Sequence, residues 1–202
     1  MRNCKKTVLL RVSGENLDRI AERVSRSLLA GNVCIIPTDT LYGIVALDRC
    51  RDAVRRVFEI KHRPRNKPFI RLIGDTESLK KYTEQELPVS LRKYWPGPLT
   101  LVFRGLEGGT VAVRRPDSEF LEKIFELTAG EPLVAPSANL SGEEDILECG
   151  ELFQTFDKHV HIIVCGTIRA TASASTIVDI SGDRWRIVRM GALRIGQDEL
   201  EP

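Results

Sequence analysis

The strongest constraint on the fold is a run of apolar residues, VCIIP at 33–37, which ends at a proline. A strand that is apolar on both sides is typical of the interior of a sheet whose two faces are both covered. Before it, residues 17–28 carry apolar side chains at helical spacing, and Asn16 can cap that helix. The run therefore indicates an inner strand covered by helices.

The rest of the chain continues this alternation of strands and helices. We expect further strands at 7–12, 68–74, 99–103, 110–114, 132–136, 161–165, 175–180 and 184–190. Hairpins are predicted between 99–103 and 110–114 and between 175–180 and 184–190. Helices are predicted at 50–61, 75–83 and 87–95, after a cap at Asp117, and at 148–158. The order predicts an α/β fold with a mixed, twisted open sheet flanked by helices.

Length and composition limit the class of protein. A chain of 202 residues that is 42% hydrophobic can bury one sizeable core, so we expect a single domain over 1–202 with a tail at 191–202. The formal charge of +2 does not mark a protein that coats nucleic acid, although it is compatible with a local basic cleft. No apolar run approaches the roughly 20 residues that span a bilayer, and no signal peptide is recognisable. We therefore expect a cytoplasmic protein without membrane contact.

The five cysteines are odd in number, far apart and without a C-x-x-C pair. This pattern argues against a disulfide framework and against a zinc site, so we expect reduced thiols. His159 and His161 flank the start of a strand, which is weak support for a metal site. We predict no metal ligands in the chain itself.

Four polar stretches lie at strand ends or beside them, where open α/β sheets form their ligand crevices. They are PTDTLYG (37–43), KHRPRNKP (61–68), APSANLSG (135–142), and STIVDI (175–180) with RWRIVRMG (184–191). Each has an ordinary structural explanation as a capping turn, a solvated loop or an edge strand. The basic stretch also suits a triphosphate, because lysine offers a point charge and arginine a bidentate fork. The small residues of the third let backbone N–H groups approach a phosphate or carboxylate.

Several enzyme classes are disfavoured. The chain has no G-x-x-x-x-G-K-[ST] loop, no G-x-G-x-x-G fingerprint and no G-x-S-x-G elbow. It also shows no spacing that singles out an acid/base pair or a nucleophilic triad. Any nucleotide chemistry here would depend on positioning and on stabilising negative charge.

Six collinear motifs resemble those of the YrdC/TsaC family of threonylcarbamoyl-adenylate synthases. They are PTDTLYG, K-x-R-P-x-x-K-P (61–68), W-P-G-P-L-T (95–100), V-A-V-R-x-P (111–116), P-S-A-N-x-S-G (136–142) and S-T-I-V-D (175–179), and they cover roughly 33–190. The resemblance implies a twisted sheet with a concave basic cleft, in a single-domain form. It implies a nucleotidyltransferase that makes threonylcarbamoyl-AMP and pyrophosphate from L-threonine, bicarbonate and ATP with Mg²⁺. Its partners would be tRNA and a downstream threonylcarbamoyl-transferase complex.

Carried over residue by residue, the resemblance also implies a site. L-Threonine would be held by Thr40, Arg114 and Ser137. ATP would be faced by Lys61, Arg63, Lys67, Thr110, Asn139, Ser175 and Arg189, with Lys61 and Arg63 as the catalytic cations. The chain departs from the pattern of many relatives at 143–148, where EEDILE stands in place of a Ser-Pro and adds acidic charge near the nucleotide.

Other functions stay open on the same fold. A non-catalytic protein could grip double-stranded RNA or tRNA in a basic cleft, and it would show salt-dependent RNA binding without ATP consumption. Carbamoyl-adenylate chemistry, as in the YrdC-like domain of hydrogenase maturation proteins, is another alternative. The YciO-type branch is a third.

Overall fold

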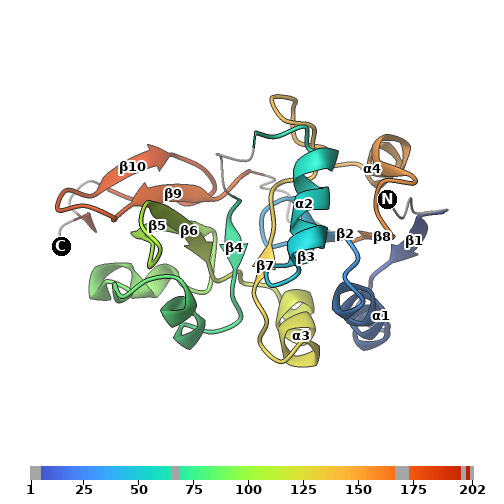
Figure 1. Ribbon diagram of the computed structural model, residues 1–202, viewed down its shortest axis with the longest axis horizontal. Coiled ribbons are helices and arrows are strands. Elements are labelled where there is room, and N and C mark those ends of the chain that lie inside the picture. The colour runs from blue at the N-terminus through green and yellow to red at the C-terminus, as the bar shows by residue number, and fades with distance from the viewer. Residues whose placement is uncertain (1–5, 65–68, 167–172, 197–198, 201–202) are drawn as a thin grey trace.

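The computed structural model describes residues 6–64, 69–166, 173–196 and 199–200. Within that part, one sheet has the strand order β1-β8-β2-β3-β7-β4-β6-β5-β9-β10 (Figure 1). The strands are β1 (Val8–Arg11), β2 (Cys34–Pro37), β3 (Tyr42–Leu47), β4 (Arg71–Leu72), β5 (Leu99–Arg104), β6 (Thr110–Arg114), β7 (Leu133–Val134), β8 (Ile162–Cys165), β9 (Thr176–Asp179) and β10 (Arg186–Arg189). The α-helices are α1 (Leu17–Leu29), α2 (Arg51–Ile60), α3 (Glu119–Leu127) and α4 (Cys149–Phe156). Two short 3₁₀ helices are η1 (Glu77–Lys81) and η2 (Val89–Tyr94).

The pairing of the strands is mixed. β2 runs parallel to β8 and antiparallel to β3, while β5 runs parallel to β9. The predicted hairpins are confirmed, since β5 pairs antiparallel with β6 and β9 with β10. An open mixed sheet flanked by helices confirms the predicted fold class.

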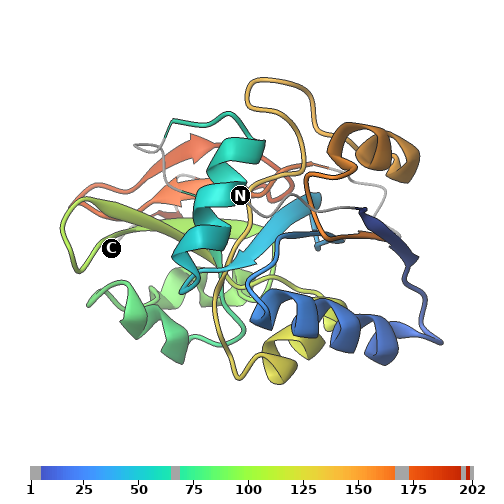
Figure 2. The same ribbon diagram turned by 45° about the vertical axis from the view of Figure 1, so that its right-hand side comes forward.

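Helices cover both faces of the β1 to β7 half of the sheet. α1 and α3 lie on one face, and α2 and α4 lie on the other (Figures 1 and 2). Along β2 the side chains alternate between the two: Ile35 packs with the α2 and α4 side, while Cys34 and Ile36 pack with the α1 and α3 side. None of the three is exposed. The VCIIP run is apolar throughout because β2 has no solvent face.

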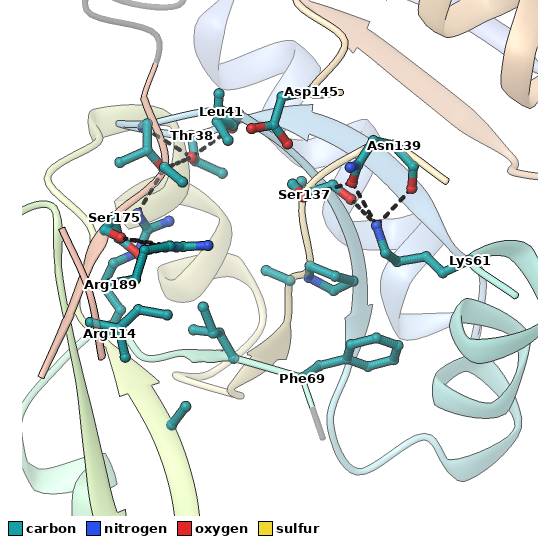
Figure 3. A pocket seen from close by; sticks show the side chains of 18 of the residues that line it. Thr38, Leu41, Lys61, Phe69, Arg114, Ser137, Asn139, Asp145, Ser175 and Arg189 are labelled. Carbon is teal, nitrogen blue, oxygen red and sulfur yellow. Dashed lines mark hydrogen bonds between the residues drawn. The ribbon is translucent and has the colours of Figure 1, made fainter. Parts of the chain in front are cut away.

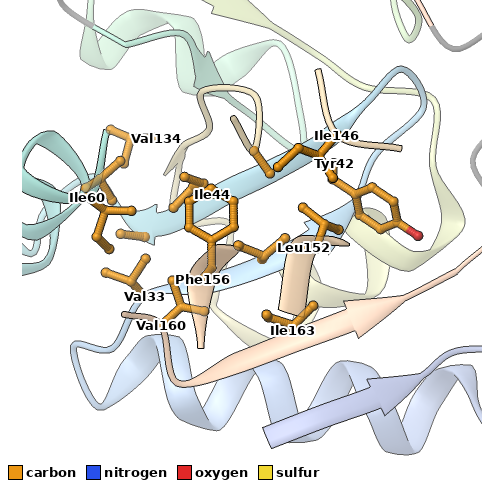
Figure 4. Packing of buried hydrophobic residues seen from close by; sticks show 14 of the residues in the cluster. Val33, Tyr42, Ile44, Ile60, Val134, Ile146, Leu152, Phe156, Val160 and Ile163 are labelled. Carbon is orange, nitrogen blue, oxygen red and sulfur yellow. The ribbon is translucent and has the colours of Figure 1, made fainter. Parts of the chain in front are cut away.

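The core on the α2 and α4 side is built from large side chains of distant segments (Figure 4). Phe156 and Leu152 of α4 and Ile60 of α2 pack over Ile44 and Ile163 of the sheet. Burying a side chain of this size stabilises the fold by about 1.5–3 kcal/mol. This cluster fixes the end of α2 and the start of β3, both of which border the pocket described below.

A third cluster covers the β5, β6 and β9 part of the sheet. η1 and η2 supply Leu79 and Leu91 to it, beside Phe103 of β5. Ile195 and Leu200 are each 4% exposed within it. These two residues of the expected tail are therefore part of the core.

The structure differs from the sequence-based expectation in several elements. β3 was not predicted, although all six of its residues are buried. The strands expected at 68–74 and 132–136 shorten to β4 and β7, of two residues each. The helices expected at 75–83 and 87–95 are short 3₁₀ turns, η1 and η2.

Two caps also differ. Ser118, not Asp117, caps α3, and its hydroxyl accepts a hydrogen bond from the N–H of Leu121 at 3.4 Å. Asn16 stands at the cap position of α1, but its amide closes the turn before the helix, between the N–H of Ser13 and the carbonyl of Arg11. A local side chain-to-backbone bond competes with capping at such positions.

The expectation of reduced thiols is wrong for two cysteines. The structure pairs Cys149 with Cys165 in a disulfide, with their Cα atoms 5.6 Å apart. Cys149 begins α4 and Cys165 ends β8. Because α4 packs directly on β8, the fold brings together two cysteines that are 16 residues apart in the sequence. Wide spacing in sequence did not reveal this contact.

Among the described residues, no helix is both long and apolar enough to cross a membrane.

Candidate active site

A pocket of about 400 Å³ lies where the segments carrying the polar motifs meet (Figure 3). Its walls come from the β2–β3 turn, the end of α2, the end of β6, the loop after β7, and the β9 and β10 hairpin. The volume falls in the range of about 300–1,000 Å³ that is usual for small-molecule sites. The fold therefore brings together stretches that are far apart in the chain.

Most of the residues predicted to bind ligand line this pocket. They are Thr40, Lys61, Arg63, Arg114, Ser137, Asn139, Ser175 and Arg189. Lys67, also predicted, lies outside the described residues.

Thr110 is the predicted residue that the structure does not bring into the pocket. Ala112 and Arg114 line the pocket from β6, whereas Thr110 is exposed at the opposite end of that strand. Side chains two apart share a face of a strand, so Thr110 lies on the same face but beyond the pocket wall. Its role in binding stays a prediction.

The floor at one end of the pocket is a buried guanidinium. The Arg114 side chain is 6% exposed, and its Nη1 donates a hydrogen bond to the Thr40 hydroxyl at 2.7 Å. Its Nη2 lies 3.4 Å from the Asp39 carboxylate, whose side chain is 3% exposed. Burial lowers the pKa of Arg114, while Asp39 opposes that shift and Arg189 adds to it.

The described residues do not satisfy all the donors of this guanidinium. Within the described part of the chain, Nε of Arg114 is buried without a hydrogen-bond partner. A guanidinium presents its donors as a planar fork that matches a carboxylate. This end of the pocket suits a small carboxylate ligand.

The turn that carries Thr40 is held in place by Thr38. The Thr38 hydroxyl donates to the carbonyl of Leu41 at 2.7 Å and accepts from the N–H of Thr40 at 3.1 Å. The PTDT stretch thus forms a threonine-stabilised turn and also places a hydroxyl in the pocket. The structural and the functional interpretation of this stretch are therefore compatible.

Lys61 lies at the other end, and all three of its protons are engaged (Figure 3). Its Nζ donates to the carbonyl of Ser137 at 2.7 Å, and to the carbonyl and side-chain oxygens of Asn139 at 2.6 and 2.8 Å. Burial lowers its pKa to about 8, the nearby charge of Arg63 adds to the shift, and Asp145 opposes it. In this structure Lys61 shapes the loop after β7.

Arg63 follows the end of α2 and stacks on an aromatic ring. Its guanidinium carbon lies 5.5 Å from the centroid of the Phe69 ring, which itself stacks on Phe58 at 4.1 Å. Burial lowers the pKa of Arg63. The ring holds the cation at the pocket wall while its charge stays near the space a phosphate would take.

Arg189 closes the opposite wall. Its Nη2 and Nε donate to the Ser175 carbonyl at 2.9 and 3.2 Å, and the Ser175 hydroxyl shares a hydrogen bond with Thr100 at 2.8 Å. Burial lowers the pKa of Arg189, and Asp145 opposes that shift. Four cations, on Lys61, Arg63, Arg114 and Arg189, therefore converge on one pocket.

Sequence reasoning missed some of the lining. Asp145 is the one carboxylate among the described lining residues, and it was noted only as part of an acidic departure from the family pattern. A strip of apolar side chains from the sheet carried no signal, because these residues simply looked like strand positions; they are Val102, Ala112, Ile177 and Val188. Such a strip suits the flat face of a heterocyclic base.

The described residues include no group of three or more His, Cys, Asp or Glu side chains that could hold a metal. A single carboxylate beside several cations does fit Mg²⁺ that arrives with nucleotide phosphates, since this ion keeps its waters and uses few protein ligands.

The chain is similar in sequence to proteins of one known family. A profile of the Sua5/YciO/YrdC family, described as "Telomere recombination", matches residues 26–191. The chain belongs to this family. This family member is 32% identical over 206 aligned residues to the threonylcarbamoyl-AMP synthase of Pyrococcus abyssi, covering 96% of this chain and 60% of that relative. The chain thus spans less than two thirds of that relative's length.

Solved structures of the family agree in fold. The crystal structure of P. abyssi Sua5 complexed with L-threonine superposes with a TM-score of 0.81 at 30% identity, over 92% of this chain and 57% of that one. The crystal structure of E. coli YciO superposes with a TM-score of 0.79, over 92% of this chain and 95% of that one. At 21% identity the latter supports the fold alone.

Proposed function

We propose that this chain is a nucleotidyltransferase that forms threonylcarbamoyl-AMP and pyrophosphate from L-threonine, bicarbonate and ATP. The single observation that carries the proposal is the buried Arg114 at the pocket floor, whose Nη1 donates to the Thr40 hydroxyl and whose Nε has no hydrogen-bond partner among the described residues. A relative with this enzyme name and a solved relative with bound L-threonine support the choice of ligand.

The two ends of the pocket divide the substrates between them. Arg114 takes the carboxylate of threonine, and the hydroxyls of Thr40 and Ser137 orient the amine side of the amino acid. Lys61, Arg63 and Arg189 face the phosphates of ATP. The apolar strip on the sheet carries the adenine.

The chemistry needs no nucleophile from the protein. The amine of threonine and bicarbonate combine to a carbamate with release of water, and a carbamate oxygen attacks the α-phosphorus of ATP. The bond to the β,γ-diphosphate breaks, and pyrophosphate leaves. The pocket accelerates this step by holding both reactants together and by placing cations where negative charge develops.

A Mg²⁺ ion bound with ATP would supply positive charge to the phosphates at the end of the pocket where Lys61, Arg63 and Arg189 lie. The product carries a reactive mixed anhydride, which a downstream threonylcarbamoyl-transferase complex passes to tRNA.

The test is pyrophosphate release from purified protein with ATP, Mg²⁺ and bicarbonate. We expect release that requires both L-threonine and bicarbonate and that falls sharply with L-serine. Release that is independent of the amino acid would refute the proposal. Salt-dependent binding of RNA without any consumption of ATP would instead support the non-catalytic alternative.

A further inference from the structure

The nucleotide end of the pocket contains one side chain that opposes the binding of a polyphosphate. Asp145 lies in the loop between β7 and α4 and lines the pocket together with Lys61, Arg63 and Arg189. Its carboxylate points toward the pocket interior, between Lys61 on one side and Arg189 on the other (Figure 3). An anionic ligand held by those cations would also face this carboxylate.

The electrostatics agree with this placement. Asp145 acts on cations of two different walls: its charge opposes the burial that lowers the pKa of Lys61, at the end of α2, and of Arg189, on β10. Coulombic effects of this kind fall off with distance, so the carboxylate lies within range of both walls at once. Together with its place among the lining residues, this puts the carboxylate near the cations that would hold the phosphates.

A bare carboxylate at that point would repel a triphosphate. A divalent cation between the two reverses the sign of the interaction, because one carboxylate oxygen and phosphate oxygens are ligands that Mg²⁺ accepts together with water. No hydrogen bond or ion pair to another described residue holds the Asp145 carboxylate in a competing arrangement. Asp145 is an exposed residue, so its carboxylate is hydrated and can exchange a water molecule for the metal ion.

We propose that Asp145 is the protein ligand for the Mg²⁺ that accompanies the nucleotide, so that this loop couples metal binding to nucleotide binding. The inference rests on the proposed function only in taking a nucleoside triphosphate as the ligand of the pocket.

The test measures binding, not turnover. The affinity of the protein for a non-hydrolysable ATP analogue is measured by calorimetry with Mg²⁺ and with EDTA, without threonine or bicarbonate. Three proteins are compared: the unchanged chain, Asp145→Asn, and Glu144→Gln. Glu144 is the exposed neighbour of Asp145 and does not line the pocket. Glu144→Gln removes the same charge as Asp145→Asn, so it serves as the matched control.

We expect Mg²⁺ to strengthen analogue binding in the unchanged chain and in Glu144→Gln, and to do so about 10- to 100-fold less in Asp145→Asn. In EDTA, Asp145→Asn should bind the analogue as tightly as the unchanged chain or more tightly, since a repulsive charge is gone. An equal effect of Mg²⁺ in all three proteins would overturn the proposal. So would analogue binding that Mg²⁺ does not strengthen in the unchanged chain.

This outcome is separable from the proposed activity. Loss of the Mg²⁺ effect in Asp145→Asn, in a chain that releases no pyrophosphate with threonine, would support the metal ligand and refute the synthase. Threonine-dependent release with an unaltered Mg²⁺ effect would do the reverse.

Discussion

The ammonium of Lys61 donates to both oxygens of Asn139, at 2.6 Å to the carbonyl and 2.8 Å to the side chain. These bonds, with a third to Ser137, tie the end of α2 to the loop after β7, 78 positions away. The residue with the strongest claim to bind phosphate is thus also the residue that shapes the loop. Lys61 therefore contributes both its positive charge to the pocket and its hydrogen bonds to the shape of the loop.

Replacing Lys61 by an uncharged residue should therefore destabilise the fold as well as abolish turnover. In Lys61→Met, three oxygens each lose a hydrogen bond from the ammonium, two of these bonds being buried, and we expect the free energy of unfolding to fall by about 2–4 kcal/mol in urea titrations. Lys80→Met is the control, because Lys80 makes an exposed pair with Glu77 and its loss should change stability by less than about 1 kcal/mol. Unchanged stability of Lys61→Met would mean that the loop holds its shape without the lysine.

The depressed pKa of Lys61 predicts a pH dependence of activity. Burial lowers this pKa to about 8, so the side chain is cationic below that pH and loses its proton and one donor above it. Pyrophosphate release should fall as the pH rises through about 8. Lys61→Arg provides the control, since a guanidinium stays charged throughout this range, and its residual activity should show no such fall. A fall that persists in Lys61→Arg would assign the titration to another group.

Arg114 should matter for threonine far more than for ATP. Removing the charged partner of a desolvated carboxylate typically costs about 2–5 kcal/mol, or roughly 30- to several-thousand-fold in affinity. We expect Arg114→Ala to weaken L-threonine binding by that factor in calorimetry, with little change for an ATP analogue. Arg115→Ala is the matched control, because Arg115 is the next residue and donates to the Gly74 carbonyl outside the pocket. Equal loss of both ligands in Arg114→Ala would contradict this role.

Asp39 should stabilise the fold through Arg114. Its carboxylate is the counter-charge of that buried guanidinium, so Asp39→Asn leaves a buried cation uncompensated and should lower the free energy of unfolding by about 3–5 kcal/mol. The double variant Asp39→Asn/Arg114→Met should lose less than the sum of the two single changes in denaturant titrations. Additive losses would show that the two residues act independently.

The sequence predicted the parts of the fold whose signal is local. The apolar run of β2 and the two hairpins were visible because each is specified by its own residues and its turn. β3 was not predicted, because its residues directly follow a polar turn motif and were assigned to that motif. β4 and β7 are only two residues long because their extent depends on pairing across the sheet with each other and with β6 and β3.

The site shows the same limit. Motif residues such as Thr40 and Arg189 could be assigned to one pocket from the sequence, because the resemblance carried their order. The direction of each side chain could not. Asp39 lies beside Arg114 and not among the residues that line the pocket, and Lys61 faces backbone carbonyls, because their partners come from segments remote in sequence.

Gly191 provides a test of how the wall around Arg189 is built. A Cβ added at this position would collide with the carbonyl oxygen of Ala174, and it would lie 2.7 Å from the carbonyl atoms of Ser175. Since Arg189 is anchored on the Ser175 carbonyl, Gly191→Ala must push the end of β10 away from the segment that holds this arginine.

We expect Gly191→Ala to weaken binding of an ATP analogue by about tenfold or more, through displacement of Arg189, and to lower the thermal midpoint of unfolding. Gly182→Ala is the control, because Gly182 lies before β10 and a methyl group added there would meet no heavy atom within 4 Å, so its affinity and midpoint should stay unchanged. If Gly191→Ala binds the analogue normally, then the position of Arg189 does not depend on this close approach.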